Sequence, residues 1–291
     1  MFFVHRWIGW WTLKLVAYPV ITYFFLTNKN ARLASHDFLS RVQAAGTNFG
    51  NHSLTYVSFK HFLQFGRNLL DRLAAWSGAF NYDNVIVHQR EELLQLVAEG
   101  TGALVIVSHL GNLEICRALL NESNAIKLNI LVQSHEADKF NRLMKEINED
   151  THLNLIQVGE VTPATAIQLR EKLDAGEIIA TSGDRTPAGG GRQSTASFIG
   201  DTALFPQGPY ILASVLRCPV YLLFCVRDSR GYQIFFEKFA DRIKLSRATR
   251  EADISRWIQK FANRLGHHTL LFPLQWNNFY LYWNKPADPG D

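Results

Sequence analysis

Short apolar segments alternate with helical patterns from about residue 83 onward. Each apolar segment is almost continuously hydrophobic, as expected of a strand that is buried on both faces of a sheet. The alternation of strand and helix favours parallel pairing, with the helices covering the sheet. The sequence therefore predicts an α/β fold with a largely parallel central sheet flanked by helices. The expected strands are residues 84–88, 102–108, 127–133, 153–158, 177–181, 218–226 and 232–239.

We expect the chain to divide into three parts. Residues 1–28 form a hydrophobic segment, residues 29–80 a helical extension and residues 81–291 the α/β domain. Within the extension, helices are expected over residues 31–45 and 53–76, because a glycine follows each of these stretches closely. The helices expected in the α/β domain are residues 90–100, 113–121, 137–147, 162–173, 207–216 and 246–266.

The hydrophobic segment contains an apolar run, residues 7–26, that is about as long as a helix spanning a bilayer. Its tryptophans and tyrosines favour the membrane interface. Lys14 and Pro19 weaken the prediction of a span, since a central lysine costs roughly 2.5–3.5 kcal/mol on insertion scales. We expect membrane association, either as a spanning helix or as an interfacial one. The alternative is a core helix of a soluble protein.

The overall charge is not sufficient to indicate a nucleic-acid partner, and we expect none. The formal net charge is +4 and the isoelectric point is about 8.9, a mild basic excess that suits an anionic membrane or an acidic protein. The three cysteines lie in apolar stretches without metal-ligand spacing, so we expect reduced core thiols and no metal. Neither a Walker A string nor a G-x-G-x-x-G string occurs, and we expect no cofactor.

Histidine and glutamate flank an expected strand-to-helix corner in "SHLGNLE", residues 108–114. His109 follows the last strand residues and so lies at the carboxyl edge of the sheet, where open α/β sheets bind ligands. Gly111 permits a tight turn, and Asn112 caps the next helix or donates to substrate. The turn brings Glu114 back to His109, where a carboxylate fixes the tautomer of a general base.

The spacing of these residues leaves a second interpretation open. His109 then only ends a strand, and Glu114 only complements the dipole of the following helix.

The string "HLGNLE" resembles the H-x-G-N-x-E form of the H-x4-D/E motif of bacterial lipid A late acyltransferases. These enzymes belong to the lysophospholipid acyltransferase superfamily. The order of the segments is also similar: an apolar N-terminal segment, a strand, the histidine motif, and a strand that ends in "EIIATSGDR". The strings "FIG", "FPQGPY" and "CPVYLLF" follow, and the resemblance covers residues 80–240 well. It implies an acyltransferase in which His109 is the base and Glu114 its partner.

Further substrate-binding residues are expected within a polar stretch, residues 182–197, that is expected to be a loop. Arg185 matches the arginine after the family's second strand, where a guanidinium suits a phosphate or a developing oxyanion. Asp184 beside it is expected to orient it, the alternative being a surface ion pair. Arg192 either assists with phosphate or faces solvent.

Gln207 marks a departure from the glycerolipid branches of the superfamily, which carry F-P-E-G where this chain has "FPQG". The resemblance places Gln207 at the substrate site, and the replaced glutamate argues against a glycerol-3-phosphate acceptor.

The function implied is transfer of a fatty acyl group from an acyl thioester to a hydroxyl of a lipid acceptor. The donor is expected to be acyl carrier protein or acyl-CoA, and the acceptor lipid A-like or another membrane lipid. The family places such an enzyme at the bacterial inner membrane, with its catalytic domain on the cytoplasmic face. Two alternatives remain: a membrane-associated thioesterase or lipid hydrolase that uses the same dyad, and a non-catalytic lipid-binding adaptor.

Overall fold

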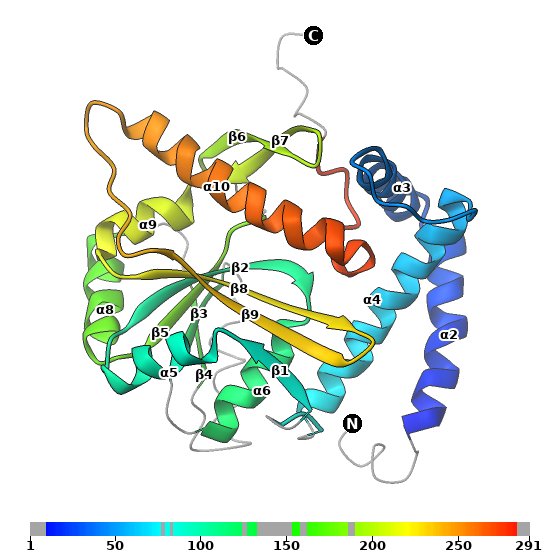
Figure 1. Ribbon diagram of the computed structural model, residues 1–291, viewed down its shortest axis with the longest axis horizontal. Helices are drawn as coiled ribbons and strands as arrows, with labels where there is room; N and C mark the ends of the chain where they lie inside the picture. Colours follow the sequence, from blue (N-terminus) through cyan, green and yellow to red (C-terminus); the bar gives the residue numbers. More distant parts are fainter. Residues whose placement is uncertain are drawn as a thin grey trace.

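A computed structural model gives the architecture of the chain (Figure 1). The helix expected at residues 137–147 and the start of the apolar run at residues 7–9 lie outside the described residues. The structure describes residues 10–76, 79–81, 84–123, 127–132, 153–157, 162–185 and 190–283.

The centre of the protein is a seven-stranded sheet with the order β1-β9-β8-β2-β5-β3-β4. All neighbouring strands pair in parallel except β8 and β9, which form an antiparallel hairpin. This confirms the predicted α/β class and its largely parallel sheet. The strands are β1 (Val85–His88), β2 (Ala103–Gly111), β3 (Leu128–Val132), β4 (Leu153–Gln157), β5 (Ile178–Ser182), β8 (Val220–Asp228) and β9 (Gly231–Ala240).

Helices cover both faces of the sheet, as its parallel strands require. Helices α8 (Pro163–Asp174), α9 (Gly208–Leu216) and α10 (Arg250–Leu271) contribute to the larger hydrophobic cluster on one face. Helices α5 (Arg90–Ala98) and α6 (Leu113–Ser123) lie on the opposite side from α10 (Figure 1). The start of α8 is as expected from its sequence, because Oγ1 of Thr162 accepts a hydrogen bond from the Thr165 N–H and Pro163 is the first helical residue.

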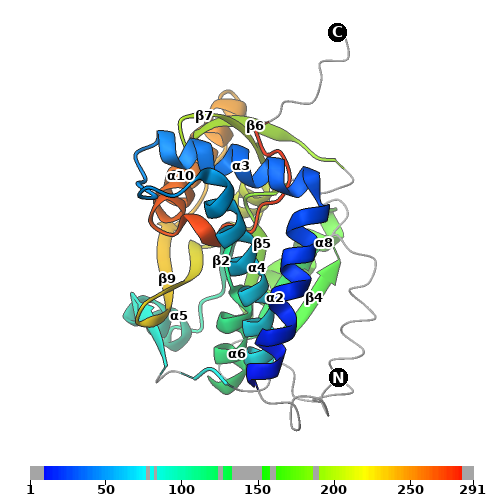
Figure 2. The same cartoon turned by 90° about the vertical axis from the view of Figure 1, so that its right-hand side faces the viewer.

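The helical extension consists of α3 (Lys29–Ala44) and α4 (Leu54–Trp76), which confirms two helices before the α/β domain. Helix α3 begins two residues earlier than expected, since Oδ1 of Asn28 caps it by accepting from the Ala31 N–H. A third helix, α2 (Trp10–Thr27), lies alongside α4, as Figures 1 and 2 both show. The two helices approach closely where Ile21 packs against Gly66.

Helix α2 is the element that the apolar run forms. It has 18 residues and contains Lys14 and Pro19. Among the helices in the described part of the chain, none is long and apolar enough to cross a bilayer. The prediction of a membrane-spanning helix is therefore not supported.

Residues 182–197 were expected to form a loop, and this expectation is wrong for the end of the stretch. Its end forms β6 (Gln193–Phe198), which pairs antiparallel with β7 (Asp201–Pro206). Ile199 and Gly200, the two residues of the turn, both have positive φ, as in the tight turns that suit hairpins. This hairpin packs beside α10 rather than in the main sheet, and its polar side chains face outward, which hides the strand signal.

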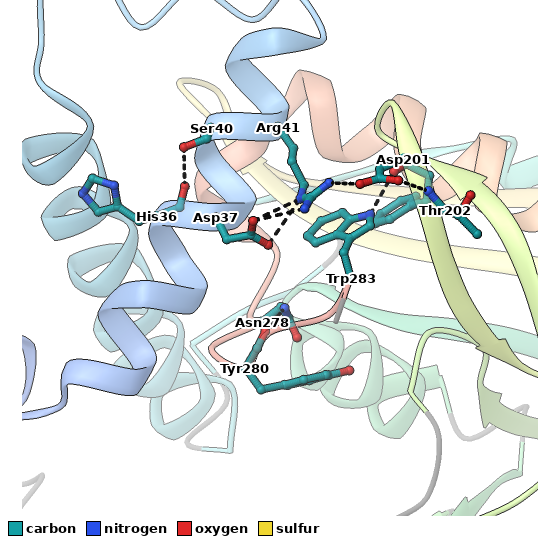
Figure 3. Close-up of polar contacts among 10 residues, drawn as sticks. His36, Asp37, Ser40, Arg41, Asp201, Thr202, Asn278, Tyr280 and Trp283 are labelled. Carbon is teal, nitrogen blue, oxygen red and sulfur yellow. Dashed lines mark hydrogen bonds and ion pairs between the residues drawn. The ribbon is translucent and has the colours of Figure 1, made fainter. Parts of the chain in front are cut away.

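The C-terminal segment returns across the molecule after α10. The short 3-10 helix η1 (Pro273–Gln275) leads into Trp276, which is buried and packs edge-on against Phe38 of α3 and Phe198 of β6. Further along, the Arg41 guanidinium of α3 lies over the ring of Trp283 and pairs with Asp37 and with Asp201 of β7 (Figure 3). The segment thus joins the helical extension to the α/β domain.

Candidate active site

The site is centred on His109 and Asp184 at the carboxyl edge of the sheet. Strands β2 and β5 pair from Ala103↔Ile178 to Val107↔Ser182, so paired residues are 75 positions apart. His109 and Asp184 continue this register just beyond the last pair, and they too are 75 positions apart. Nδ1 of His109 lies 2.9 Å from Oδ1 of Asp184, and the His109 backbone N–H donates to Oδ2 at 2.8 Å.

The Asp184 carboxylate is buried and receives four hydrogen bonds. Two come from His109, as described above. The Ser182 hydroxyl donates to Oδ1 at 3.0 Å, and the indole N–H of Trp276 donates to Oδ2 at 3.1 Å. Burial alone would raise the pKa of Asp184, but the charge and hydrogen bonds of His109, together with the Trp276 donor, outweigh it and lower the pKa to about 2. Asp184 is therefore a carboxylate at neutral pH.

An ionised Asp184 fixes the tautomer of His109. A carboxylate only accepts hydrogen bonds, so Nδ1 carries the proton of the neutral imidazole and Nε2 keeps a free lone pair. The His109 side chain is 36% exposed, and no described residue makes a hydrogen bond to Nε2. An approaching hydroxyl or water molecule can therefore meet a basic nitrogen whose ring is already oriented.

Glu114 does not occupy the position that the sequence analysis gave it. Its carboxylate pairs with Arg117 one turn further along α6, at 2.7 Å, and the partner of His109 is Asp184. The corner between β2 and α6 is held against β8, because the Asn112 N–H donates to the Cys225 carbonyl at 2.7 Å. Within α6, Glu114 and Arg117 are three residues apart and therefore lie on the same side of the helix.

Gly111 and Asn112 build this corner. Gly111 has a φ of +78°, and a Cβ atom there would lie 1.7 Å from the Cys225 carbonyl oxygen. Asn112 is fully buried; its Oδ1 accepts from the Glu114 N–H and its Nδ2 donates to the Asn68 carbonyl of α4. Of the two expected roles of Asn112, the structure therefore shows the cap.

The other expected substrate residues lie in different places. Arg185 follows Asp184 directly; its guanidinium donates to the Asn277 carbonyl and lies 5.5 Å from the ring centroid of Tyr280. Arg192 is exposed at the start of the β6–β7 hairpin. The Gln207 side chain donates to Ser194 at 2.8 Å, which ties this hairpin to the start of α9. The structure thus brings Asp184 to His109, places Arg185 on Asn277 and Tyr280, and gives Gln207 a contact within the fold.

An apolar cavity of about 260 Å³ lies between the sheet, α5 and α6. Val105 and Val107 of β2 line it, as do Ile178 and Ala180 of β5. Val107 is two residues before His109 on the same strand. Arg90 and Arg117 are the charged residues of the lining, and Arg117 is the partner of Glu114. The cavity can hold an apolar chain against β2 and β5, although neither His109 nor Asp184 is among its lining residues.

Two residues of the C-terminal segment belong to the site and were missed by sequence reasoning. Trp276 donates to Asp184, and the Asn277 N–H donates to the His109 carbonyl at 2.9 Å. The sequence shows an aromatic tail but gives no signal for this contact, because the two segments are more than 90 positions apart.

Fold and site together define an α/β protein with a histidine–aspartate pair at the carboxyl edge of a largely parallel sheet. No family model matches the chain, and no curated protein matches it either.

Proposed function

We propose that this protein is an acyltransferase of the lysophospholipid acyltransferase type, which moves a fatty acyl group from a thioester to a hydroxyl of a membrane lipid. The observation that carries the proposal is the His109–Asp184 pair, in which the imidazole is 36% exposed and no described residue makes a hydrogen bond to its Nε2. The sequence resemblance to lipid A late acyltransferases adds support, since the histidine of its motif is the residue that has a buried carboxylate partner.

The chemical step uses His109 twice. Nε2 removes the proton of the acceptor hydroxyl while that oxygen forms a bond to the thioester carbonyl carbon. The C–S bond of the tetrahedral intermediate then breaks, and the imidazolium returns its proton to the sulfur as the thiol leaves. Asp184 stays ionised and stabilises the imidazolium between the two transfers, because its pKa is about 2. The reaction forms an ester and a thiol without an acyl-enzyme.

The cavity gives the acyl chain a place against β2, and its lining reaches Val107, two residues before His109. Its lining is apolar apart from the two arginines, so burial of a hydrocarbon chain is favoured by about 25 cal/mol for each Å² removed from water. Arg185 is held by Asn277 and Tyr280, and a fixed guanidinium suits the phosphate of a donor or acceptor headgroup. Acyl carrier protein, acyl-CoA and phosphorylated lipids all carry such a phosphate.

A lipid acceptor requires contact with a membrane, and α2 offers the surface. Its large apolar side chains are exposed along the outer side of the helix, away from α4. Exposed apolar side chains of this kind suit insertion into the interface of a bilayer. The most exposed of these side chains are Leu15, Val16, Val20, Tyr23 and Leu26.

The test of the function is an acyl-transfer assay with the full chain. Acyl carrier protein and coenzyme A, each carrying a radiolabelled lauroyl or palmitoyl group, are incubated with and without an extract of total membrane lipid. We expect label in the lipid fraction only when extract is present. Label released as free fatty acid at the same rate without extract indicates a hydrolase instead, and no release from any donor contradicts catalysis and favours a lipid-binding adaptor. Mass spectrometry of lipids from cells with and without the protein then identifies the acceptor.

A further inference from the structure

The C-terminal segment reaches the candidate active site through the indole of Trp276. This indole donates to Oδ2 of Asp184, the oxygen that also accepts the His109 backbone N–H, while Oδ1 is bound to Nδ1 of His109. Trp276 is 1% exposed, and its ring packs against Phe38 and Phe198. The N–H therefore meets the carboxylate from a fixed direction.

The backbone on both sides of Trp276 is held as well. His61 of α4 is fully buried, and burial lowers its pKa to about 4, so the ring is neutral at pH 7. Its Nε2 lies 2.9 Å from the Trp276 carbonyl, which can only accept, so Nε2 carries the proton and Nδ1 accepts from the Ser35 hydroxyl. Ser58 donates in turn to Ser35 at 2.8 Å, so every hydroxyl and ring nitrogen of this buried chain has a defined role.

Asn277 binds the histidine corner directly. Its backbone N–H donates to the His109 carbonyl and its Nδ2 donates to the Gly111 carbonyl, each at 2.9 Å. Asn68 of α4 donates to Oδ1 of Asn277 at 3.2 Å and so orients the amide. Trp276 and Asn277 together contact the carboxylate, the backbone of His109 and the turn that follows it.

We propose that Trp276 is a positioning residue that holds the Asp184 carboxylate in the orientation that fixes the tautomer of His109. The expected effect of Trp276 on kcat rests on the function proposed above, whereas its expected effect on the tautomer of His109 does not. Without the indole N–H, Oδ2 of Asp184 keeps one hydrogen-bond donor, the His109 backbone N–H. A buried carboxylate with fewer hydrogen-bond donors is less firmly oriented. The carboxylate then constrains Nδ1 less, and the fraction of imidazole with Nε2 free falls.

The chain offers a matched control for this test in Trp283. Its indole N–H donates to the Phe198 carbonyl at 3.1 Å, and it is buried in the same aromatic cluster, but it does not touch Asp184. Trp276→Phe and Trp283→Phe therefore make the same change in side-chain size, and each removes one buried indole N–H donor. If Trp276→Phe does not fold, benzothienylalanine introduced at each of the two positions replaces only the N–H by sulfur and keeps the shape of the ring.

The kinetic readout is transfer from radiolabelled lauroyl-acyl carrier protein to extracted membrane lipid. We expect the change at position 276 to lower kcat roughly 10- to 100-fold with little change in KM, and the change at position 283 to leave kcat within about threefold of the wild type. Combined with Asp184→Asn, the change at position 276 should lower kcat no further, because it acts through Asp184.

The second readout is NMR of protein labelled with ¹⁵N in histidine, with the His109 signals assigned by their absence in His109→Gln. We expect the pure Nδ1–H tautomer in the wild type and in the Trp283 variant, and a mixture in the Trp276 variant. Equal kcat values and an unchanged tautomer in both tryptophan variants would overturn the proposal. If the wild type shows no transfer, the proposed function fails, and the NMR spectra still decide the role of Trp276.

Discussion

His109 and Asp184 lie 75 positions apart in the sequence, and the register of β2 and β5 brings them into contact two residues beyond the last paired residues. The ladder of two buried strands thus sets the distance between imidazole and carboxylate. A side chain on a strand end is held more rigidly than one on a free loop, which suits a site that must orient a proton acceptor.

The first prediction concerns the identity of the carboxylate partner. Asp184→Asn replaces an acceptor by an amide that can donate to Nδ1, so Nε2 becomes protonated and kcat should fall roughly 10³- to 10⁴-fold. Glu114→Gln weakens only the pair with Arg117 among the contacts described, and kcat should fall less than about tenfold. Both variants are compared in the acyl-transfer assay after their thermal unfolding has been measured. Loss of activity that is as large in Glu114→Gln as in Asp184→Asn contradicts the assignment of Asp184.

Much of the fold was predictable because it depends on local patterns. Continuous apolar runs of strand length, separated by helical stretches, identified the parallel sheet, and His109 at the end of such a run had to lie at its carboxyl edge. The partner of His109 was not predictable in this way. Asp184 was recognised only as a neighbour of Arg185, because strand order and register are set by packing across the whole sheet.

Two further differences between the expected and the observed site also arise from packing between segments that are distant in the sequence. The spacing of Glu114 from His109 is compatible with contact, but Glu114 pairs with Arg117 of its own helix and Asp184 lies beside Nδ1 of His109. Trp276 reaches Asp184 only because α10 and η1 carry the tail back over the sheet edge. Contacts between distant segments therefore decide which of several carboxylates and donors form the site.

The second prediction concerns the corner itself. Gly111→Ala places a methyl group against the Cys225 carbonyl at a positive φ, so the free energy of unfolding should fall by roughly 2–4 kcal/mol. Gly208→Ala at the start of α9 is the control, since its Cβ meets no atom within 4 Å and the change should be near neutral. Urea unfolding of both variants provides the comparison. Equal stability of the two variants is incompatible with the tight approach of β2 to β8.

The third prediction concerns pH. Burial lowers the pKa of His61 from 6.5 to about 4, so the unfolded chain binds a proton there at a higher pH than the folded protein does. This contribution to stability is complete above pH 6.5 and is lost as the pH falls toward 4, which amounts to roughly 3 kcal/mol. In urea unfolding at a series of pH values, His61→Gln should be less stable at pH 7.5 and should lose less stability on acidification. His52→Gln, which alters an exposed imidazole, should keep the wild-type pH dependence, and a His61 variant that also keeps it contradicts the buried neutral ring.

The fourth prediction concerns the outer side of α2. Val20→Glu and Leu26→Glu place charges on the exposed apolar face and should greatly weaken co-sedimentation with vesicles of phosphatidylethanolamine and phosphatidylglycerol. Val215→Glu alters a similarly exposed apolar side chain on α9 and should leave vesicle binding unchanged. Binding that is lost equally in all three variants, or in none of them, argues against α2 as the membrane-contacting surface.

The role of His109 is tested by the rate of acyl transfer by His109→Ala, measured with radiolabelled lauroyl-acyl carrier protein and extracted membrane lipid. We expect a kcat roughly 10²- to 10⁴-fold below that of the wild type, because the positioned base is absent. His52→Ala, in which an exposed histidine is removed, should transfer at the wild-type rate. A folded His109→Ala variant that transfers the acyl group at the wild-type rate would contradict the central claim that this imidazole, held by Asp184, activates the acceptor hydroxyl.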